Sequence, residues 1–428
     1  MTKALDYLFD LHSQANAGQP AGMTSVCSAH PMVIEAALIE AKETCSFACI
    51  EATCNQVNQD GGYTGMTPAD FHDFVMSIAR KLGFPVDRIV LGGDHLGPNP
   101  WRKMPTLDAM AKAIVMTRQY AAAGFGKIHL DASMSCADDP VPLPVPIVAE
   151  RAAALAKAAE EGAKAGGYPG PAYIVGTEVP VPGGASEKLE TVEVSRPQDA
   201  ADTIEKHRIA FAERGLDDAF KRVVGLVVQP GVEFGHTNVI AFVPEAAEQL
   251  SAWRQEFGSV VFEAHSTDYQ TADALADLVD GGFCILKVGP GLTFALREAF
   301  YGLDQIAGVL VPDYEAGSLP RTMERVMLAM PNDWNAYYHG AETSQFMQRH
   351  FSYSDRIRYY WTHKAANMAV EDLLACLEGM DLPDPLVSQF LPRHYADVVA
   401  GKVQPDARSL AIAAIRCALA PYSAACVR

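Results

Sequence analysis

Short β-branched runs alternate with longer amphipathic stretches from residue 24 to residue 300, and this alternation constrains the fold more than any other feature of the sequence. Apolar runs of this kind are typical of parallel strands whose two faces are both covered, and the helices between them supply that cover. The predicted strands are residues 24–29, 47–53, 88–94, 127–133, 172–178, 223–229, 259–265 and 283–289.

The stretches between the runs have helical signals. Residues 67–83 and 106–124 each begin with a threonine at a capping position and end at glycine, and residues 146–166, 198–215 and 271–282 supply further helical patterns. Eight strand–helix units of this size predict an α/β protein with a (β/α)₈ TIM barrel, typically roughly 250 residues long. An open doubly wound sheet is the alternative, but "CSAHPMVIEAA" after the first strand has no phosphate fingerprint.

The alternation stops after residue 300. Residues 301–428 read as mainly helical, with aromatic patches "WNAYYHG" and "YSDRIRYYW". We therefore predict a barrel domain over residues 1–300, with its active-site face at the carboxyl ends of the strands. Residues 301–428 are predicted to form a helical extension packed on the barrel, and this extension offers a surface for a homo-oligomer.

Charge and cysteine usage narrow the class of protein. A formal net charge of −18 argues against nucleic acid and anionic membrane as partners, because both require clustered Lys and Arg. The sequence contains no uninterrupted apolar stretch of about 18 residues, so we predict no membrane span. The first 22 residues lack the apolar core of a signal peptide. The nine cysteines include no CxxC pair, which favours a reduced, cytoplasmic protein. A metal cluster of Cys45, Cys49 and Cys54 is the less favoured alternative.

Polar side chains follow every one of the eight predicted strands. In a barrel these positions face one shared pocket, and burying so many polar and charged groups without a function would be costly. The residues concerned are Ser28, His30, Glu51, Asn55, Gln56, Asp94, His95, Asp131, Ser133, Glu178, Gln229, Glu233, His236, His265, Asp268 and Lys287.

Each of these residues also has a structural interpretation when taken singly. A lone histidine such as His30 or His129 is more often structural than a ligand. Asp94 could cap its loop through an Asx turn. Glu178 could pair with an arginine on the rim, and Lys287 could be a salt-bridge partner. The convergence of eight strand ends favours the functional interpretation.

The residue types suggest metal-assisted chemistry. His95, His265 and Glu178 form the N/N/O set typical of catalytic zinc, so we expect a divalent metal, Zn²⁺, as cofactor. Such a metal would polarise a substrate carbonyl and stabilise an enediolate. Asp94 would act as a base or proton shuttle, and the further candidate catalytic carboxylates are Glu51, Asp131 and Glu233.

The segment "KVGPGLTFALREA" places glycines after the eighth strand and opens a helix, which is the usual phosphate position in barrels. We predict that a phosphate or carboxylate binds near Gly289 and Gly291, helped by Lys287. A sugar phosphate or a sugar carboxylate could occupy this position. The remaining candidate substrate-binding residues are Ser28, Asn55, Gln229 and Asp268.

Six ordered segments carry a resemblance to a known family. These are "GGDHLGPNPW", "GTEVPVPGG", "VQPGVEFG", "FEAHSTDYQ", "LKVGPGLTFALREA" and "YSDRIRYYW". They resemble the Z-type (GatZ/KbaZ-like) subunit family of class II D-tagatose-1,6-bisphosphate aldolase over nearly the whole chain. The resemblance implies a TIM barrel related to class II aldolases. Asp94 and His95 resemble the Asp-His pair in which the histidine binds zinc and the aspartate moves a proton, and His265 resembles a second zinc-binding histidine. The chain has Glu178 where those aldolases have another histidine.

The resemblance leaves two functions open in carbohydrate catabolism. Some family members are similar to metal-dependent epimerases of ketohexuronates, which implies a lyase or epimerase working by retro-aldol cleavage of a ketohexose phosphate or ketohexuronate. Others assist a separate class II aldolase catalytic subunit in galactitol or N-acetylgalactosamine breakdown and have been called non-catalytic. An older family label, tagatose 6-phosphate kinase, is disfavoured because the sequence has no GxxxxGK[ST] loop.

Overall fold

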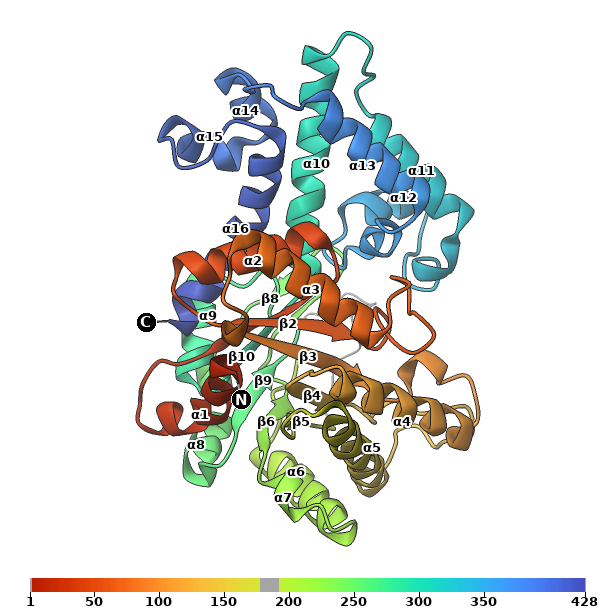
Figure 1. Cartoon of the computed structure of the whole chain (residues 1–428), viewed down its shortest axis with the longest axis vertical. Coiled ribbons are helices and arrows are strands. Elements are labelled where there is room, and N and C mark those ends of the chain that lie inside the picture. The colour runs from red at the N-terminus through yellow and green to blue at the C-terminus, as the bar shows by residue number, and fades with distance from the viewer. Residues whose placement is uncertain (1, 178–191, 428) are drawn as a thin grey trace.

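The computed structural model describes residues 2–177 and 192–427 and shows a closed eight-stranded parallel barrel within this part of the chain (Figure 1). All eight predicted runs form barrel strands. Around the barrel the order is β1, β10, β9, β6, β5, β4, β3 and β2. The strands are β1 (Met23–Cys27), β2 (Ala48–Thr53), β3 (Ile89–Leu96), β4 (Lys127–Leu130), β5 (Ala172–Val175), β6 (Val223–Val228), β9 (Val261–Ala264) and β10 (Ile285–Val288). The predicted (β/α)₈ fold is confirmed.

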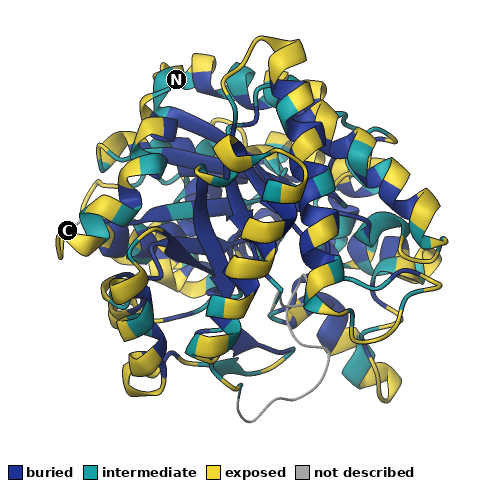
Figure 2. Cartoon of the chain, turned by 90° about the horizontal axis from the view of Figure 1, so that it is seen from below, coloured by how far each residue is buried: buried dark blue, intermediate teal, exposed yellow. Residues whose placement is uncertain are grey.

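Helices cover the outside of the barrel, and Figure 2 shows the buried strands surrounded by helices whose outer faces are exposed. After β1 to β5 come α2 (Pro31–Glu43), α3 (Pro68–Leu82), α4 (Thr106–Ala122), α5 (Val145–Gly166) and α6 (Pro197–Glu213), followed by the single turn α7 (Asp217–Phe220). After β6 a hairpin of β7 (Glu233–Phe234) and β8 (Val239–Ile240) precedes α8 (Pro244–Phe257), and α9 (Ala272–Asp280) follows β9. The short 3₁₀ turns are η1 (Val86–Arg88), η2 (Asn99–Trp101), η3 (Pro331–Asp333) and η4 (Arg356–Tyr360).

One of the two predicted threonine caps is confirmed and the other is wrong. Thr67 and Asp70 form a reciprocal capping box at the start of α3, and Gly83 ends that helix with a φ of 60°. At α4 the capping position is Pro105, and Thr106 is the first helical residue. The Thr106 hydroxyl donates to Asp138 (2.6 Å) instead, because that loop lies against the helix start.

The amino-terminal helix α1 (Lys3–Asn16) closes the end of the barrel opposite the strand carboxyl ends. Its buried residues Leu5, Leu8 and Leu11 pack with residues at the beginnings of the strands, including Met23 and Val90. These apolar side chains fill the barrel at the beginnings of the strands. A polar site can therefore form at the opposite end of the barrel, where the strands have their carboxyl ends.

The carboxyl-terminal region is mainly helical, as predicted. It contains α10 (Pro290–Leu310), α11 (Ser318–Ala329), α12 (Glu342–Phe351), α13 (Lys364–Cys376), α14 (Asp384–Phe390), α15 (Pro392–Val399) and α16 (Ala407–Cys426). Residue 300 lies inside α10, which leads away from the barrel (Figure 1). The last helix, α16, returns to pack beside α2 and α9, with Arg416 bonded to Glu40 of α2 at 3.0 Å. The tail therefore contributes to the helical layer around the barrel.

Among the described helices, α16 has the length and mean hydropathy (1.4 over its most apolar window) of a membrane span. Half of that window is buried inside the protein, and Leu410, Ile415 and Leu419 pack in the core. The apolarity of α16 is thus explained by its place against the barrel.

Candidate active site

A pocket opens at the carboxyl ends of the strands, with about 680 Å³ of open space, its mouth included. The lining side chains come from both the barrel and the tail. They are Cys27, Thr53, Asn55, Gln56, Tyr63, Asp94, His95, Phe234, His265, Ser266, Asp268, Lys287, Val288, Gly289, Pro290, Arg358 and Tyr359.

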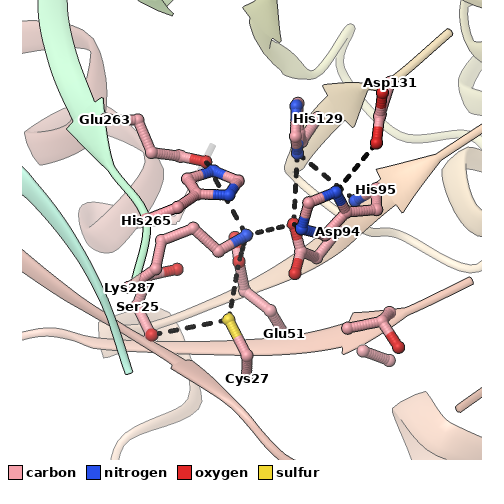
Figure 3. A network of polar contacts seen from close by, with 12 residues as sticks. Ser25, Cys27, Glu51, Asp94, His95, His129, Asp131, Glu263, His265 and Lys287 are labelled. Carbon is pink, nitrogen blue, oxygen red and sulfur yellow. Dashed lines mark hydrogen bonds and ion pairs between the residues drawn. The ribbon is translucent and has the colours of Figure 1, made fainter. Parts of the chain in front are cut away.

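Three imidazoles meet at the base of this pocket (Figure 3). His95 at the end of β3, His129 in β4 and His265 just beyond β9 have ring centroids 5.0 to 5.2 Å from one another. Together with Asp94, each offers one potential ligand atom, and these four atoms lie within 4.8 Å of one another. All four residues are buried. The set has the donor types and spacing of a site for a divalent metal ion.

Each histidine is held by a carboxylate. His95 Nδ1 lies 2.8 Å from Asp131, His129 Nδ1 lies 3.1 Å from Asp94, and His265 Nε2 lies 2.9 Å from Glu263. For His95 and His265, donation of these N–H groups leaves the second ring nitrogen to bind a cation, which is the usual outer arrangement of metal-bound histidines. His129 Nδ1 also accepts from the backbone N–H of His95 at 3.3 Å. The Nε2 of His129 is buried and has no hydrogen-bond partner among the described residues.

The electrostatics also fit a cation. Burial lowers the pKa of His265 to about 3, so this imidazole is neutral and keeps a lone pair. Burial opposes protonation of His95 as well, yet Asp94 and Asp131 raise the pKa of His95 above its ordinary value. The negative potential that these two carboxylates create would stabilise a bound metal ion in the same way.

A second layer of charges lies beneath the histidines. Lys127 Nζ contacts Glu51 at 2.5 Å and Glu263 at 2.6 Å, and Lys287 Nζ contacts Glu51 at 2.9 Å and also Asp94. Although burial raises the pKa of a carboxyl, the two lysines hold the pKa of Glu263 well below its usual range. The layer is therefore an ionised network that fixes Glu263 and Asp94, which in turn hold His265 and His129.

The glycines of "LGGDHLG" make room for this arrangement. A Cβ on Gly92 would collide with the side chain of Glu51, and a Cβ on Gly97 would collide with the backbone of Asp131. Between them His95 has a φ of 48°, where the β3–β4 register shifts. A bulge of this kind re-aims a side chain, and here it turns His95 toward His129 and Asp131.

The structure brings together six of the residues predicted from strand ends. Glu51, Asp94, His95, Asp131, His265 and Lys287 belong to the network described above (Figure 3), and Asn55, Gln56, Asp268 and Gly289 line the pocket. The Ser28 hydroxyl accepts from the His30 backbone, and the Gln229 side chain accepts from the backbone of Gly231 and Val232, so both stabilise loops. Glu178, the predicted third metal ligand, lies outside the described residues.

The predicted anion site is already engaged by a side chain of the protein. Asp268 Oδ1 accepts from the backbone N–H groups of Gly289 (3.0 Å) and Gly291 (2.7 Å) at the start of α10. Lys287 is directed into the carboxylate layer and not toward these amides. A substrate anion at this position would have to displace Asp268.

Sequence reasoning gave no functional role to Lys127, His129 and Glu263. The signal that could have found them is alternation along a strand, since residues two apart share a face. Lys127, His129 and Asp131 follow that spacing along β4 and just beyond it, and Glu263 and His265 follow it at the end of β9 and just beyond it. The spacing therefore predicts that the charged residues Lys127 and Glu263 lie on the same strand faces as the predicted site residues Asp131 and His265.

Glu233, predicted as catalytic, lies on the β7 hairpin, where its carboxyl accepts from the backbone of Phe234 at 2.9 Å. Burial raises the pKa of Glu233 to about 7. A carboxyl whose pKa is raised by folding contributes stability at acid pH that is lost as the pH rises through the folded pKa. We expect Glu233→Gln to stabilise the protein by about 2 kcal/mol more at pH 8 than at pH 5.

Urea unfolding of both proteins at the two pH values measures this difference. Glu248→Gln, at an exposed position on α8, is the control and should change stability equally at both pH values. An equal effect of Glu233→Gln at pH 5 and pH 8 would contradict the raised pKa.

The barrel, its histidine–carboxylate cluster and its helical tail define a TIM-barrel protein with a candidate metal site. The D-tagatose-1,6-bisphosphate aldolase subunit GatZ/KbaZ-like family model matches residues 8–427, and the chain belongs to this family of carbohydrate catabolism. It is 54% identical over 418 residues to a D-tagatose 6-phosphate 4-epimerase of Agrobacterium fabrum (strain C58), covering 98% of each chain. It is 50% identical over 417 residues to the D-tagatose-1,6-bisphosphate aldolase subunit GatZ of Salmonella paratyphi B, covering 97% of this chain and 98% of that one.

A solved structure is also closely similar. The crystal structure of a probable tagatose 6 phosphate kinase from Sinorhizobium meliloti 1021 superposes with a TM-score of 0.88 at 54% identity, covering 95% of this chain and 100% of that chain. The names given to these relatives describe three different activities, so the choice among them for this chain depends on its site.

Proposed function

We propose that this protein is a metal-dependent epimerase that inverts C4 of a ketohexose 6-phosphate, interconverting D-tagatose 6-phosphate and D-fructose 6-phosphate. The observation that carries the proposal is the buried set of three imidazoles and Asp94, in which Asp131 holds His95, Glu263 holds His265 and Asp94 itself contacts His129. The name of the Agrobacterium relative, which is 54% identical, supports the choice of substrate.

The proposed reaction is a retro-aldol cleavage followed by re-addition. Asp94 takes the proton of the C4 hydroxyl while the C3–C4 bond breaks, and the electron pair of that bond passes into an enediolate of the C1–C3 fragment. The C4–C6 fragment becomes an aldehyde. After the aldehyde turns its other face to C3, the bond forms again and Asp94 returns the proton. No atom or electron is gained or lost overall.

The histidines have a separate task. A divalent cation, Zn²⁺ in our proposal, held by His95, His129 and His265, would polarise the C2 carbonyl and share the charge of the enediolate. Lys287 contacts Asp94 and keeps it ionised and in place, since Lys287 and His95 hold the pKa of Asp94 well below its usual range although burial opposes this. Phe234 and Tyr359 help to keep water from the reacting fragments.

A direct assay tests the proposal. Purified protein loaded with Zn²⁺ is incubated with D-tagatose 6-phosphate, and carbon NMR follows the sugars. We expect D-fructose 6-phosphate to appear without net accumulation of three-carbon products. Accumulation of trioses from D-tagatose 1,6-bisphosphate would assign a lyase instead, and turnover of ketohexuronates alone would assign a sugar-acid epimerase. No reaction with any of these sugars would contradict the enzymatic proposal.

The second candidate function is a non-catalytic subunit that stabilises a partner class II aldolase, as the name of the Salmonella relative suggests. The observation in its favour is an apolar surface on α12, where Phe346 is 44% and Phe351 49% exposed. The complete buried cluster favours the enzyme, because ionised groups in a barrel interior are costly to retain without use. A kinase is disfavoured by the absence of a GxxxxGK[ST] loop from the sequence.

The proposal includes a cytoplasmic location and a homo-oligomer. All nine cysteines are free thiols in the structure, which supports a reducing compartment. Neither nucleic acid nor membrane is a proposed partner.

Asp94→Asn tests the assigned base. Because the amide keeps the size of the carboxylate but accepts no proton, we expect kcat to fall on the order of 100-fold while Zn²⁺ is retained. Turnover and metal content of the same preparation provide the measurement. Asp73→Asn on the exposed face of α3 is the matched control, with no loss of turnover. An Asp94→Asn protein with full turnover would remove Asp94 from the proton transfer.

A further inference from the structure

The tail reaches the mouth of the barrel at η4 and adds two residues, Arg358 and Tyr359, to the pocket lining. Several contacts hold this segment in place. The Tyr359 ring packs edge-on against Tyr63 at 5.0 Å between centroids, and Tyr269 donates to the Tyr353 carbonyl at 2.6 Å. Asp355, whose φ is 44°, accepts from Thr293 of α10 at 2.6 Å. The position of Arg358 is therefore fixed by the barrel as well as by the tail.

Arg358 makes hydrogen bonds that orient it without neutralising its charge. Its guanidinium donates to the carbonyls of Ser354 and Asp355 (3.0 Å to the latter) and to the Tyr359 hydroxyl (2.9 Å). Among the described residues, no carboxylate forms an ion pair with Arg358. Lys287, the other cation of the lining, contacts Glu51 and Asp94. Arg358 thus has no ion-pair partner among the described residues, and the nearby carboxylates Asp268 and Asp355 interact with its charge only at longer range.

The alternative anion site in the same pocket is less suited. The amides of Gly289 and Gly291 already bind Asp268, so a phosphate there would have to displace a carboxylate. A guanidinium can offer two parallel N–H donors to a phosphate, and this geometry makes arginine the usual partner of such groups. In a protein with a formal net charge of −18, a local cation is needed to attract an anionic sugar.

We propose that Arg358, supplied by the carboxyl-terminal tail, binds the phosphate of the substrate at the end of the sugar remote from the C3–C4 bond. This assignment rests on the proposed function for the identity of the sugar, and the phosphate-binding role itself can be tested without turnover. During epimerisation Arg358 holds the phosphorylated aldehyde fragment in the pocket while that fragment turns its other face. The tail then has a positioning role in the reaction as well as a place in the fold.

The test compares Arg358→Gln with the parent protein, both loaded with Zn²⁺. We expect KM for D-tagatose 6-phosphate to rise by about 10- to 100-fold, while kcat/KM for unphosphorylated D-tagatose stays unchanged. Arg358→Lys, which keeps the charge but loses the paired donors, should give a smaller rise. The control Arg321→Gln removes the same charge from an exposed position of the tail and should leave both sugars unaffected.

Calorimetric titration with inorganic phosphate gives a readout independent of catalysis. Arg358→Gln should weaken phosphate binding by about the same factor as the rise in KM. Weakened phosphate binding in a protein that epimerises no sugar would support the role of Arg358 while contradicting the proposed reaction.

Unchanged phosphate affinity in the folded variant, or equal losses on D-tagatose and its 6-phosphate, would overturn the role of Arg358. A selective loss on ketohexuronates would overturn it in favour of a carboxylate. Failure of both Arg358 variants to fold, judged by circular dichroism, would overturn it in favour of a structural role.

Discussion

Replacing His129 with alanine is expected to abolish stoichiometric Zn²⁺ binding and to lower kcat/KM on the order of 1,000-fold. The reason is geometric. His129 contributes one of three imidazoles whose ring centroids lie 5.0 to 5.2 Å apart, and its Nε2 has no hydrogen-bond partner among the described residues. Removal of one ligand from such a set loses both affinity and Lewis acidity. Elemental analysis after dialysis measures the metal, and the epimerase assay measures turnover.

His207 provides a matched control. It is buried like His129, its Nδ1 contacts the Thr203 carbonyl at 2.8 Å, and its Nε2 has no hydrogen-bond partner in the described part of the chain. It lies on α6, outside the pocket lining. His207→Ala therefore removes a buried imidazole of equal size, and we expect it to retain Zn²⁺ even if its stability falls. Full zinc occupancy in His129→Ala would remove His129 from the ligand set.

The fold was predictable because the barrel strands are covered on both faces. Runs such as residues 223–229 and 283–289 are apolar at nearly every position, and the helical stretches between them have their own start and stop signals. The place of α16 was not predictable in the same way. Nothing local in residues 407–426 shows that they pack beside α2 and α9, because that packing depends on how α10 leaves the barrel.

The same distinction between local sequence signals and tertiary contacts applies to the site residues. Asp94, His95, His265 and Lys287 follow directly after or within apolar runs and could be found by looking at strand ends. Alternation along the strands could place Lys127 and Glu263 on the face of the site, but it could not give their ion pairs, because Glu51 lies 76 positions from Lys127 in the sequence. Arg358 depends on tertiary contacts between Tyr359 and Tyr63. Sequence reasoning thus locates the pocket, while pairings across the barrel decide which residues fill it.

Replacing Lys127 with methionine is expected to destabilise the protein by about 3 to 5 kcal/mol. Lys127 is fully buried and contacts Glu51 at 2.5 Å and Glu263 at 2.6 Å. Its removal leaves Lys287 as the cation that contacts both carboxylates in the described part of the chain. Urea unfolding measures the loss. Lys112→Met, which breaks the exposed 2.9 Å pair with Asp60, is the control and should cost at most about 1 kcal/mol.

The pH dependence of this loss separates a charge effect from a packing effect. In the parent, Lys127 and Lys287 hold the pKa of Glu263 well below its usual range despite burial, so both carboxylates are ionised. Without Lys127, we expect burial to raise their pKa values above those of the unfolded chain. A carboxyl with a raised folded pKa loses stability as the pH rises. The deficit of Lys127→Met should therefore be larger at pH 8 than at pH 5, and Glu263→Gln in the same protein should reduce it. A deficit independent of pH would show that Lys127 acts through packing alone.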